Sequence, residues 1–302
     1  MWIASLHIYP IKGVRAVDLD KANVEDRGLA GDRRWLVVDE KGVGITQRSH
    51  SRLATITARQ TEQGLHLSAP GAEDLLVAAP SGASRSDIKI WDDDVSAVLA
   101  DERAHQWLSS VLDDALRLVF MDDGAQRAKA NQWTPAGVPT SFADAYPILI
   151  ATTGSLRALN EEIAKSGGDP VTMRRFRPNL VIDCEDPWRE DYWKTLRIGR
   201  VELDLVKPCD RCVVTTKDQA TGESMGKEPL ESLVRIRRSG DPRLKGVLFG
   251  WNAAPRAPGE IAVGDAVEIL EDRPEGFPIA GVNPRAGSDL HRTSPRGQDR
   301  QS

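Results

Sequence analysis

The chain has 302 residues, of which 40% are hydrophobic and 28% charged, as in an ordinary globular protein long enough for two domains. Its formal net charge of -5 argues against a general nucleic-acid binder, because such proteins are usually basic. The sequence shows no signal peptide, no apolar run of about 18 or more residues and only three cysteines, so we expect a cytoplasmic protein without a membrane span.

The first part of the chain, residues 1–121, reads as a β-rich domain. Short strand-like segments are separated by Gly, Asp, Asn and Ser turns, and several of them alternate, as Leu65, Leu67 and Ala69 do. This pattern predicts a sheet closed into a barrel or a sandwich. The expected strands are WIASLHIY, RWLVVDE, LATITARQ, GLHLSA, DLLVAA and SDIKIW.

A helix is predicted over residues 101–112 and a strand over 116–120. One face of this helix carries Ala104, Trp107, Leu108 and Val111. Residues 121–143 are polar and contain two prolines and two glycines, which predicts a long surface connection or a lid.

The second domain is expected over residues 122–271. YPILIAT predicts a strand, and a helix follows over 153–165 with Thr153 as its N-cap and Leu156, Leu159 and Ile163 as its buried stripe. Further strands are predicted at NLVID, LRIG, VELDLV and RCVVTT, and a short helix at PLESLVRI.

The end of the chain changes character. IAVGDAVEIL predicts a hairpin that turns at Gly264–Asp265. Residues 272–302 are rich in Pro, Gly, Ser and Arg, which predicts a disordered tail. The whole chain is therefore expected to be a mixed α/β, β-rich protein.

Two cysteines stand three positions apart in KPCDRC, residues 207–212. A zinc site is disfavoured, because Cys184 and five scattered histidines do not complete a ligand set. A redox dithiol is disfavoured, because VVTT favours a strand where that motif needs a helix. Two interpretations stay open: one thiolate binds a soft metal, its pKa lowered by Lys207 and Arg211, or both cysteines are buried and only pack.

Several segments together resemble the MOSC family, in the branch that contains YcbX and the mitochondrial amidoxime-reducing component. They occur in the family's order along nearly the whole chain: LHIYPIKGVRAV, GLAGDRRWLVVDEKGVGITQR, SFADAYPILIAT, FRPNLVID, KPCDRCVVTTKDQATGE, LFGWN and PGEIAVGDAVEIL. The resemblance implies a MOSC β-barrel with a smaller MOSC N-terminal β-barrel-like domain. Because Lys12 and Arg33 match its cofactor site, a second division stays open, in which residues 1–34 pack with the second domain around an insert at about 35–121.

The resemblance also implies a molybdenum cofactor, with Cys212 as the metal ligand and a catalytic residue and Cys209 as a structural neighbour. Asp144 is the second catalytic candidate, as a proton relay. The positions that match cofactor contacts are Lys12, Gly13, Arg33, Asp144, Ala145, Tyr146, Arg177, Asn179, Asp210, Arg211, Cys212 and Asn252. Gly13 stands where relatives often have serine, and Asn252 where the mitochondrial protein has tyrosine.

The implied activity is reduction of N-hydroxylated small molecules, namely amidoximes, hydroxylamines and N-hydroxylated nucleobases, from N–OH to N–H. The chain shows neither a four-cysteine cluster motif nor a nucleotide-binding GxGxxG, so we expect electrons from a separate flavin or iron–sulfur reductase. The alternatives are a sulfur carrier with a persulfide on Cys212 and a non-catalytic cofactor-binding module.

Overall fold

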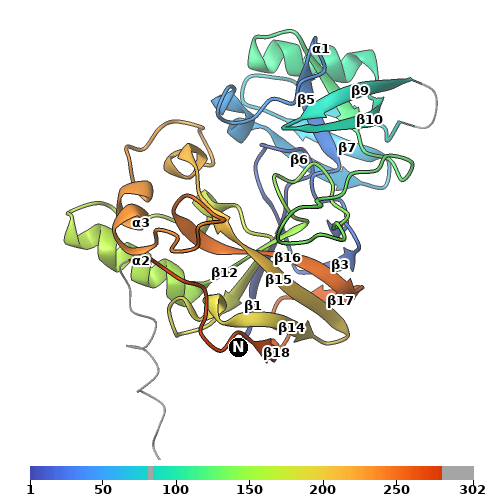
Figure 1. Cartoon of the computed structure of the whole chain (residues 1–302). Helices are drawn as coiled ribbons and strands as arrows, with labels where there is room; N and C mark the ends of the chain where they lie inside the picture. The colour runs from blue at the N-terminus through green and yellow to red at the C-terminus, as the bar shows by residue number, and fades with distance from the viewer. Residues whose placement is uncertain (81–83, 281–302) are drawn as a thin grey trace, which may run out of the picture.

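The architecture is that of a computed structural model that describes residues 1–80 and 84–280 (Figure 1). One large sheet of eight strands organises the fold. Its strands, in spatial order, are β18 (Glu268–Asp272), β14 (Trp193–Ile198), β15 (Val201–Asp210), β16 (Leu248–Ala257), β12 (Ile148–Thr152), β13 (Leu180–Asp183), β1 (Trp2–Ile8) and β2 (Val17–Leu19).

The strand at the very start of the chain is thus part of the large sheet. β1 pairs antiparallel with β13, and β3 (Lys21–Glu25) pairs with β17 (Gly259–Ala262) in a three-stranded sheet that β4 (Gly28–Leu29) completes. Among the paired strands of residues 1–80 and 84–280, only β12 and β13 run parallel, and helix α2 (Thr153–Lys165) makes the connection that a parallel pair needs. We call residues 1–34 and 121–280 the large lobe.

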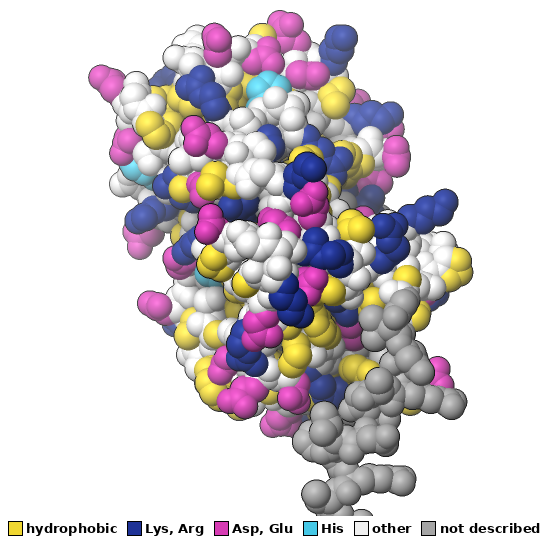
Figure 2. Space-filling model, turned by 90° about the vertical axis from the view of Figure 1, so that its left-hand side faces the viewer, with side chains coloured by type: hydrophobic (Ala, Val, Ile, Leu, Met, Phe, Trp, Pro, Cys, Tyr) yellow, Lys and Arg dark blue, Asp and Glu magenta, His cyan; other side chains and the backbone are white. Residues whose placement is uncertain are grey.

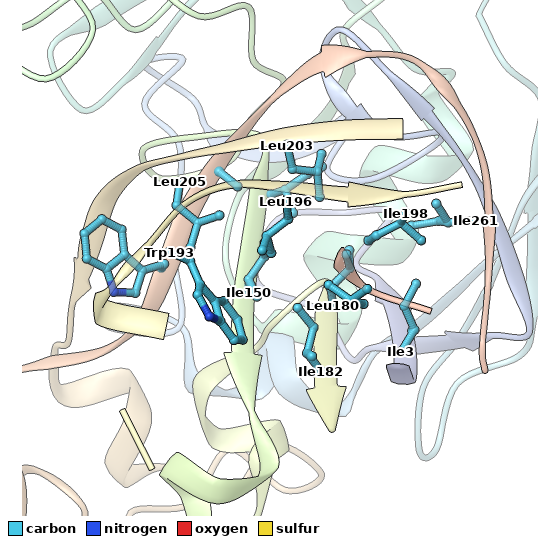
Figure 3. Packing of buried hydrophobic residues seen from close by; sticks show 14 of the residues in the cluster. Ile3, Ile150, Leu180, Ile182, Trp193, Leu196, Ile198, Leu203, Leu205 and Ile261 are labelled. Atoms are coloured by element: carbon cyan, nitrogen blue, oxygen red, sulfur yellow. The ribbon is translucent and has the colours of Figure 1, made fainter. Parts of the chain in front are cut away.

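The core of the large lobe is formed by aliphatic side chains that the curled sheets enclose (Figure 3). Ile3 of β1, Ile150 of β12 and Leu203 of β15 lie in this core, and none of them is exposed. Burying such side chains contributes about 1.5–3 kcal/mol each. Residues from both ends of the chain therefore stabilise one core.

The small lobe, residues 35–120, carries two sheets of its own and two cores, to which the large lobe adds Ile11, Val14, Met121, Ala125 and Phe142. A four-stranded sheet has the order β5 (Trp35–Asp39), β11 (Leu116–Phe120), β10 (Asp93–Leu99) and β9 (Arg85–Ile90). A three-stranded sheet contains β6 (Thr57–Thr61), β7 (Gly64–Ser68) and β8 (Leu75–Val77), preceded by the 3-10 turn η1 (Ser51–Thr55). Helix α1 (Glu102–Leu112) packs on β11.

The helices of the large lobe lie together at one side of the sheet (Figure 1). α2 packs against α3 (Leu230–Ile236) through a cluster that contains Leu159, Ile163 and Leu233. Three short 3-10 turns complete the lobe: η2 (Met173–Phe176), η3 (Arg189–Asp191) and η4 (Val213–Thr216).

Most predicted elements are confirmed, including the helices at 101–112, 153–165 and PLESLVRI, and the β-rich class. Four details are wrong. The N-cap of α2 is Thr152, whose side chain accepts from Ser155 N. Leu53–Thr55 lies in a 3-10 turn, and so does VVTT. IAVGDAVEIL forms no hairpin, because β17 pairs with β3 and β18 with β14.

Two predicted irregular segments contain residues that anchor them to the fold. Residues 121–143 have no helix or named strand and are mostly exposed or half-buried, as a surface connection should be, but Arg127 is buried and donates to Asp93 Oδ2 (2.8 Å) and Ser141 O (2.7 Å). The predicted start of the disordered tail, residue 272, is too early, because Phe277 is buried against Trp251. The rest of that tail, residues 281–302, lies outside the described residues.

The surface gives no sign of a large patch of one charge on the face displayed in Figure 2, where Lys and Arg side chains lie among Asp and Glu side chains. Within residues 1–80 and 84–280, no helix is both long enough and apolar enough to cross a membrane.

Candidate functional site

A cavity of about 460 Å³ lies where the two lobes meet. All twelve predicted site residues line it: Lys12, Gly13, Arg33, Asp144, Ala145, Tyr146, Arg177, Asn179, Asp210, Arg211, Cys212 and Asn252. With the exception of Asn252, which lies within β16, they come from chain segments next to the ends of β1, β5, β12, β13 and β15. The roles of these residues remain predictions.

Lys12 is a buried cation just beyond β1. Its backbone N–H donates to Trp35 O (2.9 Å), which fixes the segment between β1 and β5. Its ammonium donates to Phe142 O (3.1 Å) and forms an ion pair with Asp144. Burial lowers the pKa of Lys12, and the nearby carboxylate opposes that shift. A further anion in the cavity would stabilise the charged form of the buried Lys12 ammonium.

Asp144 is the carboxylate that faces Lys12, and 74% of its side chain is exposed to the cavity. It also accepts from Trp91 Nε1 (3.2 Å). The partly enclosed position raises the pKa of Asp144, but the charge and hydrogen bond of Lys12 outweigh this and hold the pKa well below its usual range. Asp144 is therefore ionised at neutral pH and is a weak base, which does not favour a proton relay.

Arg33 and Arg177 both lie over the ring of Tyr9, at 4.4 and 4.1 Å from its centroid. Both have left-handed backbones, with φ of 50° and 55°, a conformation that costs of order 1–3 kcal/mol for a residue other than glycine. Arg33 pairs with the buried Asp32. Burial lowers the pKa of Arg177 to about 10, and its guanidinium donates to Val14 O (2.8 Å).

Three of the predicted contacts mainly hold neighbouring segments in place. Asn179 is buried, accepts from Arg33 Nη1 (3.2 Å) and Leu149 N (3.1 Å), and donates to His7 O (3.1 Å). The Tyr146 hydroxyl donates to Asn131 Oδ1 (3.1 Å). Asn252 Nδ2 donates to Lys207 O (3.2 Å), across from it on β15.

The two cysteines occupy the end of β15 and the start of η4. Arg211 Nη1 donates to Cys209 Sγ (2.8 Å) and its Nη2 to Phe176 O (2.6 Å). Burial nevertheless raises the pKa of Cys209 and outweighs the attraction of Arg211, contrary to the lowered pKa that we expect from the flanking cations. Cys212 is the N-cap residue of η4, and its carbonyl accepts from Thr215 N (3.0 Å).

Sequence reasoning missed the part of the site that the small lobe supplies. Gln47, Arg48 and Trp91 line the cavity, and Gln47 Nε2 donates to Gly13 O (2.6 Å). The nearby Cys212 side chain raises the pKa of Arg48. Arg48 is the last residue of the ITQR segment. Neither Arg48 nor Trp91 belongs to a local sequence pattern that would mark it as a site residue.

Positive charge dominates the cavity. Its lining includes seven cations, Lys12, Arg33, Arg48, Lys129, Arg177, Lys207 and Arg211, against two carboxylates, Asp144 and Asp210. Among the ion pairs of residues 1–80 and 84–280, Arg48, Arg177 and Arg211 have no carboxylate partner. The arrangement suits an anionic ligand that brings its own phosphate or carboxylate groups.

Comparisons with known proteins cover both lobes. Residues 1–115 match the MOSC N-terminal beta barrel domain, and residues 138–268 match the MOSC domain. Mitochondrial amidoxime-reducing component 1 of Homo sapiens is 34% identical over 283 residues, which are 89% of this chain and 82% of that protein. Mitochondrial amidoxime reducing component 2 of Bos taurus is 32% identical over 280 residues, 88% of this chain and 82% of that protein.

Proposed function

The chain belongs to the family of MOSC-domain proteins with a MOSC N-terminal domain, and we propose that it is a molybdenum-cofactor-dependent reductase of N-hydroxylated compounds. Amidoximes, hydroxylamines and N-hydroxylated nucleobases are the proposed substrates. The observation that carries the proposal is the Cys212 thiol in a cavity rich in cations, in a chain 34% identical to an amidoxime-reducing component.

The residues present fit a molybdenum cofactor. Arg177 and Arg211 are guanidinium groups without a carboxylate partner among the described ion pairs, and the Nε atom of Arg211 is buried without a hydrogen bond. An anionic pterin with a phosphate tail supplies acceptors of this kind. Among the described residues, no three His, Cys, Asp or Glu side chains are grouped as metal ligands, so the metal would rely on the pterin for its other sulfur ligands.

In the proposed complex Cys212 binds the metal, while Lys12, Arg33, Arg177 and Arg211 hold the anionic groups. When bound, the cofactor supplies the two-electron chemistry that the side chains lack. Arg211 fixes the Cys209 sulfur by its 2.8 Å hydrogen bond, which leaves Cys212 as the thiol on the turn at the cavity. The overall reaction is R–N–OH plus two electrons and two protons, giving R–N–H and water.

The two electrons come from a separate redox protein, a flavin or iron–sulfur reductase. The three cysteines of this chain are too few for a four-cysteine cluster, and no GxGxxG fingerprint follows a strand. A cytoplasmic location stays a prediction, since the relatives carry the word mitochondrial in their names.

Turnover tests the proposal directly. Protein from a molybdenum-replete host is mixed with benzamidoxime and a chemically reduced viologen, and benzamidine is quantified. We expect benzamidine from the wild type, a loss of at least about 100-fold in Cys212→Ala, and no turnover with NAD(P)H alone. Cys184→Ala is the matched control, since Cys184 lies in the core of the large lobe. Absence of benzamidine from metal-loaded wild type contradicts the proposal.

A further inference from the structure

Trp91 occupies an unusual position at the tip of the β9–β10 turn. Asp93 pairs with Ile90, so that Trp91 and Asp92 form a two-residue turn. The φ of Trp91 is 56°, in the left-handed region that favours Gly, Asn or Asp. A bulky aromatic residue is strained there, and strain of this kind concentrates at functional sites.

The indole of Trp91 is fixed in the cavity by groups of the large lobe. Trp91 Nε1 donates to Asp144 Oδ1 (3.2 Å), and Lys12 Nζ lies 5.6 Å from the ring centroid. The residue is nevertheless 40% exposed and lines the cavity that Cys212 lines. A large aromatic ring is thus held in a defined orientation and remains accessible.

The ring already holds a planar nitrogen-rich group. The guanidinium of Arg48 lies 5.1 Å from its centroid. Arg48 is exposed and is held by the ring and by the Cys212 side chain, so moving it aside breaks none of the ion pairs of the described residues. Amidoximes and N-hydroxylated nucleobases contain a planar, delocalised N–C–N unit of the same shape as this guanidinium.

We propose that the Trp91 indole is the platform on which planar, conjugated N-hydroxylated substrates stack, with Arg48 moving off the ring as they bind. Trp91 is then a specificity-determining residue that favours amidoximes and N-hydroxylated nucleobases over small saturated hydroxylamines, which have no π face. The inference rests on the proposed reductase function and names the preferred substrates of the same site.

Two substrates and three variants test this platform. Benzamidoxime is planar and conjugated, and N-methylhydroxylamine is small and saturated. We expect Trp91→Ala to raise KM for benzamidoxime about tenfold, and to change KM for N-methylhydroxylamine by less than about twofold. Trp91→Phe keeps a π face and stays within about threefold of the wild type. Trp2→Ala removes a similarly exposed indole (51%) and is the matched control.

A binding measurement separates this inference from the activity. Calorimetric titration of benzamidoxime into the full chain is expected to give a Kd about tenfold higher for Trp91→Ala than for the wild type. The stacking role would be overturned if Trp91→Ala raised KM equally for both substrates. It would also be overturned if Trp91→Phe were as impaired as Trp91→Ala, since the hydrogen bond to Asp144 would then explain the effect. If the wild type binds benzamidoxime through Trp91 but never reduces it, the proposed reductase function is wrong and the stacking role of Trp91 still holds.

Discussion

At the scale of single residues, the charges of the cavity constrain what each group does. Lys12 and Asp144 pair with each other, and the pKa of Asp144 is held well below its usual range. A general acid or base works best with a pKa near the operating pH. Asp144 therefore suits the role of a fixed negative charge better than the proton relay predicted from the sequence.

Asp144→Asn tests these two roles. Because the pKa of Asp144 is held well below its usual range, we expect its carboxylate to leave no acidic limb in the kcat profile between pH 5 and 8. The asparagine still accepts hydrogen bonds from Lys12 and Trp91, so kcat should fall by less than about tenfold. A fall in kcat of about 100-fold or more with an unchanged KM would instead support Asp144 as a proton relay.

At the scale of elements, local propensity fails just after Cys212. VVTT is rich in β-branched residues, which favours a strand, but the chain forms η4 instead. Thr215 Oγ1 donates to Cys212 O (2.9 Å) and Thr216 Oγ1 to Val213 O (2.8 Å). Such local side-chain bonds offer the backbone a turn in place of a sheet ladder. The predicted strand that disfavoured a redox dithiol is therefore absent at residues 213–216.

Gly13 shows how one glycine shapes the segment that presents Lys12. Its φ of 88° is unfavourable for other residues, and a Cβ there would lie 3.1 Å from Leu53 Cδ1. A serine at this position would need a different backbone or a shifted Leu53. The glycine is thus required by the structure, whereas the sequence shows only a departure from the family's motif.

Periodicity predicted the helices and most strands because each depends on neighbouring residues. It did not predict that β17 would pair with β3, or that β1 would lie beside β13, because partners far apart in sequence leave no local signal. The site shows the same limit. The resemblance supplied its twelve predicted positions, while Trp91 and Arg48 became evident only where the small lobe meets the cavity.

At the scale of the whole molecule, stability should depend on pH through Glu190. This buried carboxyl accepts from Thr152 Oγ1 (3.0 Å) and Ser155 Oγ (2.8 Å). Burial, with the charge of Asp191, raises its pKa from 4.5 to about 7. The folded state thus binds a proton that the unfolded state has lost between pH 4.5 and 7, so this group lowers stability as pH rises through that window.

Glu190→Gln, which mimics the neutral acid, isolates this effect. We expect the free energy of unfolding of the wild type, relative to the variant, to fall by on the order of 3 kcal/mol between pH 4.5 and 8. Urea unfolding at both pH values measures it, and other titrating groups cancel in the difference. A difference between the two proteins that stays constant with pH would show that Glu190 does not titrate in this range.

The central claim is that Cys212, and not Cys209, holds a molybdenum atom in the cavity. Elemental and pterin analysis of freshly purified chain from a molybdenum-replete host tests it most directly. We predict about one molybdenum and one pterin per chain in the wild type and in Cys209→Ala, and neither in Cys212→Ala. A Cys212→Ala variant that retains the metal would contradict the claim, as would a metal-free wild type that releases sulfur to cyanide, the behaviour of a sulfur carrier.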